Sequence, residues 1–177
     1  MKTYIALLRG VNVGGYKKLP MVELRSLFSE LGFEKTQTYI QSGNVVFKSK
    51  LIDVKVLKNE IEQAILRYFK FEVSVLVISP KDLKQFFDDC PFLETQKTNS
   101  YFMFLFDKPN KDLVKKVSGL FYPNETFVIT KTVIYFYSSV GYGKAKCNNS
   151  FFEKKLNITT TTRNYKTIIK LLSLSTE

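Results

Sequence analysis

Three polar stretches of this chain carry side chains that could bind a negatively charged ligand. The first, RGVNVGGYKK (residues 9–18), combines Arg9 and Asn12 with the pair Gly14 and Gly15. Glycines permit positive φ and let backbone N–H groups approach a phosphate closely. The spacing fits neither a Walker A loop nor a dinucleotide fingerprint, because Tyr16 follows Gly15 and the loop lacks G-x-G-x-x-G. The alternative is a surface loop whose glycines form turns.

The second stretch, QSGN (residues 41–44), lies between two apolar runs with strand character. It is typical of a hairpin turn. Either it serves only to reverse the chain, or it points Ser42 and Asn44 at a ligand.

The third stretch joins GYGKAKCNN (residues 141–149) to TTTTRNYKT (residues 159–167), which precedes a helical pattern. Helix amino ends offer unpaired N–H groups and partial positive charge, and Thr162 or Asn164 can act as the cap. We expect an anion site here, formed by Lys146, Asn149, Thr161, Thr162, Arg163 and Asn164. The alternative is that the threonines and Arg163 tie the chain to neighbouring backbone or to a carboxylate.

Arginine is scarce in this chain, with four residues against 23 lysines. Two of the four, Arg9 and Arg163, lie in the polar stretches, where a planar guanidinium suits bidentate binding of an anion. Histidine is absent, which excludes Ser-His and Cys-His catalysis and disfavours zinc. The three stretches also contain no carboxylate to hold a metal ion or to act in glycoside chemistry. We therefore expect no metal and no cofactor, and we assign no catalytic residue.

The elements around the first two stretches follow a β-α-β-β-α-β order. Strands are predicted over residues 3–10 and 71–79, a hairpin over 37–49, and helices over 20–32 and 53–69. This is the ferredoxin-like order.

The second half repeats the β-α-β-β-α part of this order. A short helix starts at residues 79–82 with Ser79 as its cap, and a strand over 100–107 is apolar on both faces and therefore central. A helix, a hairpin and two more helices follow, with the last strand lost or weak. We predict an α+β protein of two ferredoxin-like lobes, residues 1–78 and 79–177. Each has an antiparallel sheet with helices packed on one face.

The net charge of +11 is concentrated at the two ends of the chain. Residues 1–50 carry +5, residues 51–130 are neutral, and residues 131–177 carry +6. This asymmetry indicates an anionic partner, or alternatively a solubility surface. No apolar run approaches the ~20 residues of a membrane helix, and the first residues lack a signal-peptide core. We expect a cytoplasmic monomer with no membrane partner.

The stretches YIALLRGVNVGG, PMVELRSLFSELGF, TYIQSGNVVF and TTRNYKTIIKLL closely resemble the bacterial family catalogued as domain of unknown function 1697. The resemblance implies two ferredoxin-like lobes and brings no established activity. The sequence departs from the family's usual pattern at Ala145, Tyr165 and Lys166.

Three functions remain open from the sequence. The first is binding of a phosphate-bearing small ligand, such as a nucleotide, in a cleft lined by the glycine-rich loop and the TTRN stretch. The second is binding of RNA or single-stranded DNA, although no base-reading pattern is present. The third is an enzyme of unknown reaction.

Overall fold

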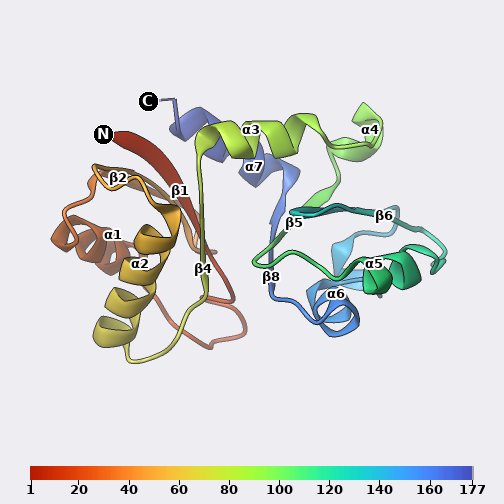
Figure 1. The fold of residues 1–177 in the computed structure, drawn as a ribbon, viewed down its shortest axis with the longest axis horizontal. Coiled ribbons are helices and arrows are strands. Elements are labelled where there is room, and N and C mark those ends of the chain that lie inside the picture. The colour runs from red at the N-terminus through yellow and green to blue at the C-terminus, as the bar shows by residue number, and fades with distance from the viewer. Residues whose placement is uncertain (177) are drawn as a thin grey trace. The chain divides into compact units, whose positions relative to one another are not determined.

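A computed structural model describes residues 1–176 of the chain. Contacts divide it into two compact units, Met1–Gln85 together with the chain from Ile169 on, and Phe86–Ile168. The elements of the first unit are β1 (Lys2–Leu8), α1 (Met21–Glu30), β2 (Glu34–Tyr39), β3 (Asn44–Ser49), α2 (Val54–Phe69) and β4 (Val75–Ile78). Figure 1 shows the ribbon and labels these elements except β3.

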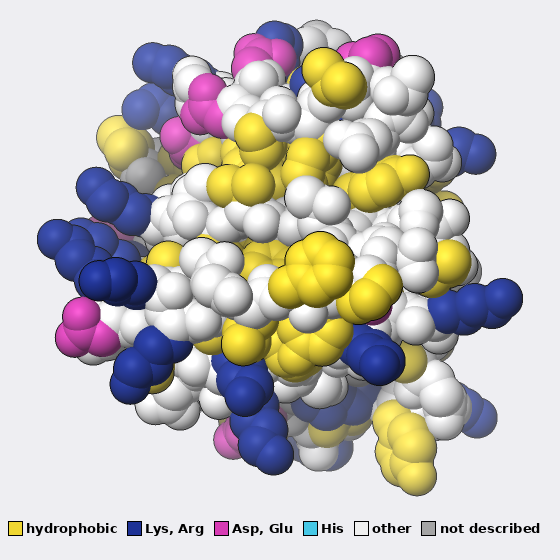
Figure 2. Space-filling view, turned by 90° about the vertical axis from the view of Figure 1, so that its right-hand side faces the viewer, with side chains coloured by type: hydrophobic (Ala, Val, Ile, Leu, Met, Phe, Trp, Pro, Cys, Tyr) yellow, Lys and Arg dark blue, Asp and Glu magenta, His cyan; other side chains and the backbone are white. Residues whose placement is uncertain are grey.

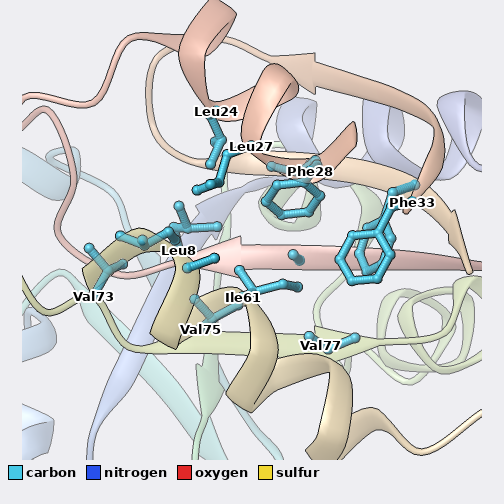
Figure 3. Close-up of a cluster of buried hydrophobic side chains, with 14 of the residues drawn as sticks. Leu8, Leu24, Leu27, Phe28, Phe33, Ile61, Val73, Val75 and Val77 are labelled. Carbon is cyan, nitrogen blue, oxygen red and sulfur yellow. The ribbon is translucent and has the colours of Figure 1, made fainter. Parts of the chain in front are cut away.

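The first sheet confirms the ferredoxin-like prediction. Its strand order is β2-β3-β1-β4 with antiparallel neighbours throughout. Both helices bury their apolar stripes against one face of this sheet. Leu24, Leu27 and Phe28 of α1 meet β-strand side chains such as Leu8 and Val75 (Figure 3). Helix spacing on one side and strand alternation on the other therefore produce a single core layer.

Three helix ends carry residues that favour capping, among them the predicted cap Ser79. Asp53 accepts a hydrogen bond from the backbone N–H of Lys55 at the start of α2. A capping box joins Ser79 and Asp82 at the start of α3 (Pro80–Asp88), which continues from the first unit into the second. Gly32 takes φ +77° directly after α1, as a C-terminal cap glycine does.

The second unit contains a second four-stranded antiparallel sheet, in the order β6-β7-β5-β8. The strong apolar strand β5 is central, as its sequence predicts. The elements after α3 are α4 (Glu94–Lys97), β5 (Tyr101–Leu105), α5 (Lys111–Ser118), β6 (Glu125–Ile129), β7 (Val133–Ser138), the 3-10 turn η1 (Tyr142–Lys144), α6 (Asn149–Leu156), β8 (Thr160–Asn164) and α7 (Tyr165–Leu174).

One prediction about this unit is wrong. We expected the last strand of the repeat to be lost or weak, and we assigned the threonine stretch only to the start of a helix. Instead Thr160–Asn164 is β8, paired in antiparallel register with the whole of β5. Threonine is β-branched and favours strands, and pairing with an apolar central strand outweighs the polarity of this segment.

Within residues 1–176, no helix combines the length and the apolar character needed to cross a membrane.

Candidate functional site

The glycine-rich loop connects β1 to α1, and its tip is an exposed reverse turn. The backbone N–H of Tyr16 donates to the carbonyl of Val13 at 3.0 Å. Gly14 and Gly15 between them take φ +58° and +80°. Positive φ at both central positions is the pattern of a type I′ turn, which explains why two glycines stand together. Gly14 and Gly15 thus match the alternative stated above, in which the glycines of a surface loop form a turn.

Asn12 holds the base of the same loop. Its amide nitrogen donates to the carbonyls of Leu19 and Gln41, and its amide oxygen accepts from the N–H of Leu19. Three of the four hydrogen-bonding positions of the side chain are therefore occupied by backbone. The bond to Gln41 also joins the loop to the QSGN turn, so these two predicted stretches lie together in the first unit.

The QSGN turn is held by its own side chains. Asn44 is fully buried and donates to the carbonyl of Tyr39 and to the hydroxyl of Ser42. Gly43 has φ +73°, and a Cβ on it would lie 2.6 Å from Leu8 Cβ and 2.7 Å from Val11 Cγ2. Only glycine fits this position, because any side chain would collide with the end of β1 and the start of the loop.

In the second unit, β8 divides the TTRN residues between the two faces of the sheet. Successive side chains of a strand point to opposite faces. Thr161 and Arg163 therefore share one face, and Thr162 and Asn164 share the other. The separation has a physical consequence: these four residues cannot all contact one ligand on one face of the sheet.

Arg163 is buried, with 6% of its surface exposed. Its Nη1 donates to Thr161 Oγ1 at 2.9 Å and to the carbonyl of Thr162 at 2.8 Å. Burial lowers the pKa of the guanidinium to about 10, so it stays charged at neutral pH. These contacts match the alternative in which Arg163 ties backbone together inside the fold.

The opposite face of β8 meets α6 through polar contacts. Thr162 donates its hydroxyl proton to Asn149 Oδ1, and the backbone N–H of Asn149 donates to the hydroxyl of Tyr142. The N–H of Thr160 donates to Glu153 Oε1 at 2.8 Å. Burial raises the pKa of the Tyr142 hydroxyl, which stays protonated. Thr162 and Asn149 thus form a polar contact between β8 and α6.

Lys146 begins a loop that already holds an internal anion. Its backbone N–H and that of Cys147 donate to the two carboxylate oxygens of Glu125, each at 2.8 Å. Desolvation raises the pKa of Glu125, but these two hydrogen bonds outweigh it, and the pKa lies below its ordinary value. The backbone N–H groups of Lys146 and Cys147 are therefore already hydrogen-bonded to a carboxylate of the protein itself.

The predicted ligand-binding residues fall into the two units. Arg9, Asn12, Gly14, Gly15, Ser42 and Asn44 belong to the first unit, and Lys146, Asn149, Thr161, Thr162, Arg163 and Asn164 belong to the second. Their shared role in one ligand site stays a prediction.

A polar pocket of about 490 Å³ opens within the second unit, at the end of its sheet where β7 and β8 finish and β5 begins. Asn164 is the predicted site residue that lines it. Gly141, Tyr165 and Lys166 also belong to the third polar stretch, although they were not named as ligand-binding residues. The lining residues from 98–101 and 137–139 were missed, because only the sheet register brings these segments together. The lining residues are Thr98, Asn99, Ser100, Tyr101, Tyr137, Ser138, Ser139, Gly141, Asn164, Tyr165 and Lys166.

Two features make this pocket suited to an anion. Helix α7 starts in its wall: Asn164 caps the helix by accepting from the N–H of Thr167 at 2.9 Å, and Lys166 lies in the first turn. The amino end of a helix and a lysine both contribute positive charge. Ser138 is 6% exposed, and among residues 1–176 its hydroxyl is buried without a hydrogen-bond partner. Such groups are rare in native proteins and call for a water or a ligand.

Within residues 1–176, no three acidic, cysteine or histidine side chains gather into a group that could hold a metal ion. Both cysteines are buried and free.

A model of the family described as "Protein of unknown function (DUF1697)" matches residues 1–135. The chain belongs to the DUF1697 family. The match includes the Met1–Gln85 part of the first unit, with its glycine-rich loop and QSGN turn, and extends to the middle of β7. It ends before β8 and α7, so the pocket of the second unit is only partly included.

A solved structure similar to this DUF1697 chain is that of the conserved bacterial protein SP0830 from Streptococcus pneumoniae. The two sequences are 27% identical, the alignment covers 98% of each chain, and the TM-score is 0.78. The similarity therefore includes β8 and α7, beyond the family match. No curated protein is significantly similar to the chain.

Proposed function

We propose that this DUF1697 protein binds a small phosphate-bearing ligand, such as a nucleotide, and that the polar pocket at the start of α7 contributes the anion-binding part of the site. The observation that carries the proposal is the pocket wall itself, where a helix amino end, Lys166 and the unsatisfied hydroxyl of Ser138 come together. A volume of about 490 Å³ suits a ligand of nucleotide size.

The lining also has groups for the uncharged part of such a ligand. Tyr101, Tyr137 and Tyr165 offer aromatic surface, and Thr98, Asn99 and Ser139 offer hydrogen-bonding side chains. Tyrosine combines a π-face for stacking with a polar hydroxyl, which suits a nucleoside. The same class of ligand is predicted by the glycine-rich loop and the TTRN stretch, and the pocket shares Asn164 with the residues predicted to bind it.

A thermal-shift series with nucleotides and simple phosphometabolites tests the proposal. A ligand present at 100 times its Kd adds about 2.7 kcal/mol to stability, which raises Tm by roughly 5–10 °C for a chain of this size. If neither nucleotides nor phosphometabolites stabilise the protein, the proposal is wrong.

The position of the site is tested with a matched pair of variants on one helix. Lys166→Glu reverses a charge in the pocket wall, whereas Lys170→Glu makes the same change one turn further along α7. We expect Lys166→Glu to weaken binding of an active phosphate compound at least tenfold by isothermal titration calorimetry, and Lys170→Glu to change it less than twofold. Equal losses would show that the charge acts from a distance and that the pocket is not the site.

A further inference from the structure

A lysine-rich surface lies on the side of the second unit that α5 and α6 cover. Helices α5 and α6 lie side by side (Figure 1). They bury apolar side chains such as Val117 and Phe152 against one face of the sheet. Their outward sides carry five exposed lysines. We call this surface the lysine face, and it consists of Lys111, Lys115, Lys116, Lys154 and Lys155.

The lysine face has little compensating negative charge. Residues 108–168 contain eleven basic and three acidic side chains. Glu125 accepts hydrogen bonds from the backbone of Lys146 and Cys147, and Glu153 accepts one from that of Thr160. The third acidic side chain, Asp112, is exposed on α5, so one exposed carboxylate stands among the five lysines. Figure 2, which looks onto the right-hand side of Figure 1, shows Lys and Arg prevailing over Asp and Glu in its lower half.

Over residues 1–176, the five ammonium groups have no partner in the fold. Among the described residues 1–176, none of the five lysines forms a side-chain hydrogen bond or an ion pair. A cluster of unpaired like charges repels itself and gains free energy when an anionic surface covers it. The lysine face therefore has the charge of a surface complementary to a polyanion.

The sheet of this unit offers no surface for base stacking. Its face opposite α5 and α6 carries Phe102, Phe104 and Tyr135, which are 0–2% exposed. Phe87 stacks on Phe102, and Tyr135 donates to the carbonyl of Phe86. Ferredoxin-like RNA-binding domains read bases with exposed aromatics on the sheet. Here those positions are buried, so a nucleic acid would be held through its phosphates.

We propose that the lysine face binds the phosphate backbone of nucleic acid without reading its sequence. Each of the two eight-residue helices is about 12 Å long, the rise of three to four phosphates along one strand. Lysines on both helices can therefore contact several consecutive phosphates. This surface is separate from the pocket at α7, and the inference goes beyond the proposed binding of a small ligand.

The test compares two variants that lose the same charge. Lys115, Lys116, Lys154 and Lys155 are all changed to Gln in the first, and the exposed Lys2, Lys50, Lys55 and Lys81 are changed to Gln in the matched control. Glutamine keeps a good helix propensity, so folding is retained and is checked by circular dichroism. Binding of a fluorescein-labelled 24-base-pair RNA duplex is measured by polarisation between 50 and 200 mM salt.

We expect the wild type to bind at 50 mM salt with an affinity independent of sequence. The lysine-face variant should bind at least tenfold more weakly, and the control within twofold of wild type. For the lysine-face variant, the slope of log K against log salt should become shallower by up to about 3.6, because each of four lost phosphate contacts contributes about 0.9. No binding by the wild type, or equal weakening by the control, would overturn the proposal.

A second assay on the same protein variants tests a membrane as the alternative partner. Leu120 and Phe121, exposed directly after α5, would also suit an anionic bilayer. Flotation with vesicles containing about 30% phosphatidylglycerol measures binding to an anionic bilayer. Binding to vesicles that depends on the lysine face, without binding to RNA, would overturn the nucleic-acid proposal and assign the surface to a membrane.

Discussion

Arg163→Lys separates a structural role for this arginine from a role in ligand binding. Arg163 is buried and makes two short hydrogen bonds from Nη1, to Thr161 Oγ1 and to the carbonyl of Thr162. Lysine keeps the charge, but its single ammonium group on a flexible chain does not reproduce the planar guanidinium. Hydrogen bonds to a charged group contribute about 1.5–3 kcal/mol each, and an unsatisfied buried partner adds to the loss.

We therefore expect Arg163→Lys to lower the free energy of unfolding by about 2–3 kcal/mol if one of the two bonds is lost. For a chain of this length, that corresponds to a Tm lower by roughly 4–12 °C. Thermal and urea unfolding without ligand measure the change. The control is Arg67→Lys at an exposed position of α2, which should stay within about 0.5 kcal/mol of wild type. If Arg163→Lys unfolds together with the wild type, the structural argument is refuted and the ligand-binding role gains support.

Three further changes test other parts of the fold. Gly43→Ala should lower the free energy of unfolding by about 2–5 kcal/mol, because the new Cβ would lie 2.6 Å from the nearest side-chain atom and the backbone has φ +73°. Urea unfolding measures this change, and the control Gly119→Ala should unfold at the same urea concentration as wild type. Ser138→Ala removes a buried hydroxyl without a partner and should leave the free protein as stable or about 1 kcal/mol more stable, whereas a loss of 2 kcal/mol would reveal a hidden partner. Glu125 has a lowered pKa in the folded state, so its contribution to stability is present above its ordinary value of 4.5 and is lost as pH falls through the folded value. Glu125→Gln should thus destabilise the protein at pH 7 and differ progressively less from wild type as the solution is acidified, which unfolding curves at pH 7, 5 and 3 would check.

Local patterns were sufficient to predict most of the fold. The α1 stripe at Leu24, Leu27 and Phe28 has helical spacing, and the central position of β5 follows from apolar residues on both of its faces. These signals depend on neighbours in sequence, which is the information that a sequence contains directly.

β8 was missed because its sequence signal is weak and its partner is distant. Thr160–Asn164 has no apolar residue, and its neighbour β5 lies about sixty residues earlier. The run of β-branched threonines was the available signal for a strand. Without the strand, the alternation that separates Arg163 from Thr162 could not be predicted either.

The pocket in the second unit depends on register even more strongly. Tyr101, Ser138 and Asn164 come from three strands, and pairing at the level of Tyr101 and Asn164 brings two of them together. The sequence around Asn164 predicts an anion site, but the sequences around Tyr101 and Ser138 give no sign of a pocket. The capping role of Asn164 was one of two alternatives, and the structure selects it because the N–H of Thr167 lies 2.9 Å from its side chain.

The position of β8 in the chain has a consequence for the protein while it is being synthesised. The first sheet is complete once β4 has emerged from the ribosome, at Ile78. The second sheet needs Asn164, close to the end of the chain, before β5 has both of its neighbours. At about 5–20 residues per second, the strongly apolar β5 has an unpaired edge for several seconds after it is made. Exposed apolar strand edges associate with other chains. We therefore expect the nascent second unit to need chaperone protection for longer than the first sheet, and a truncated chain that ends before β8 to aggregate.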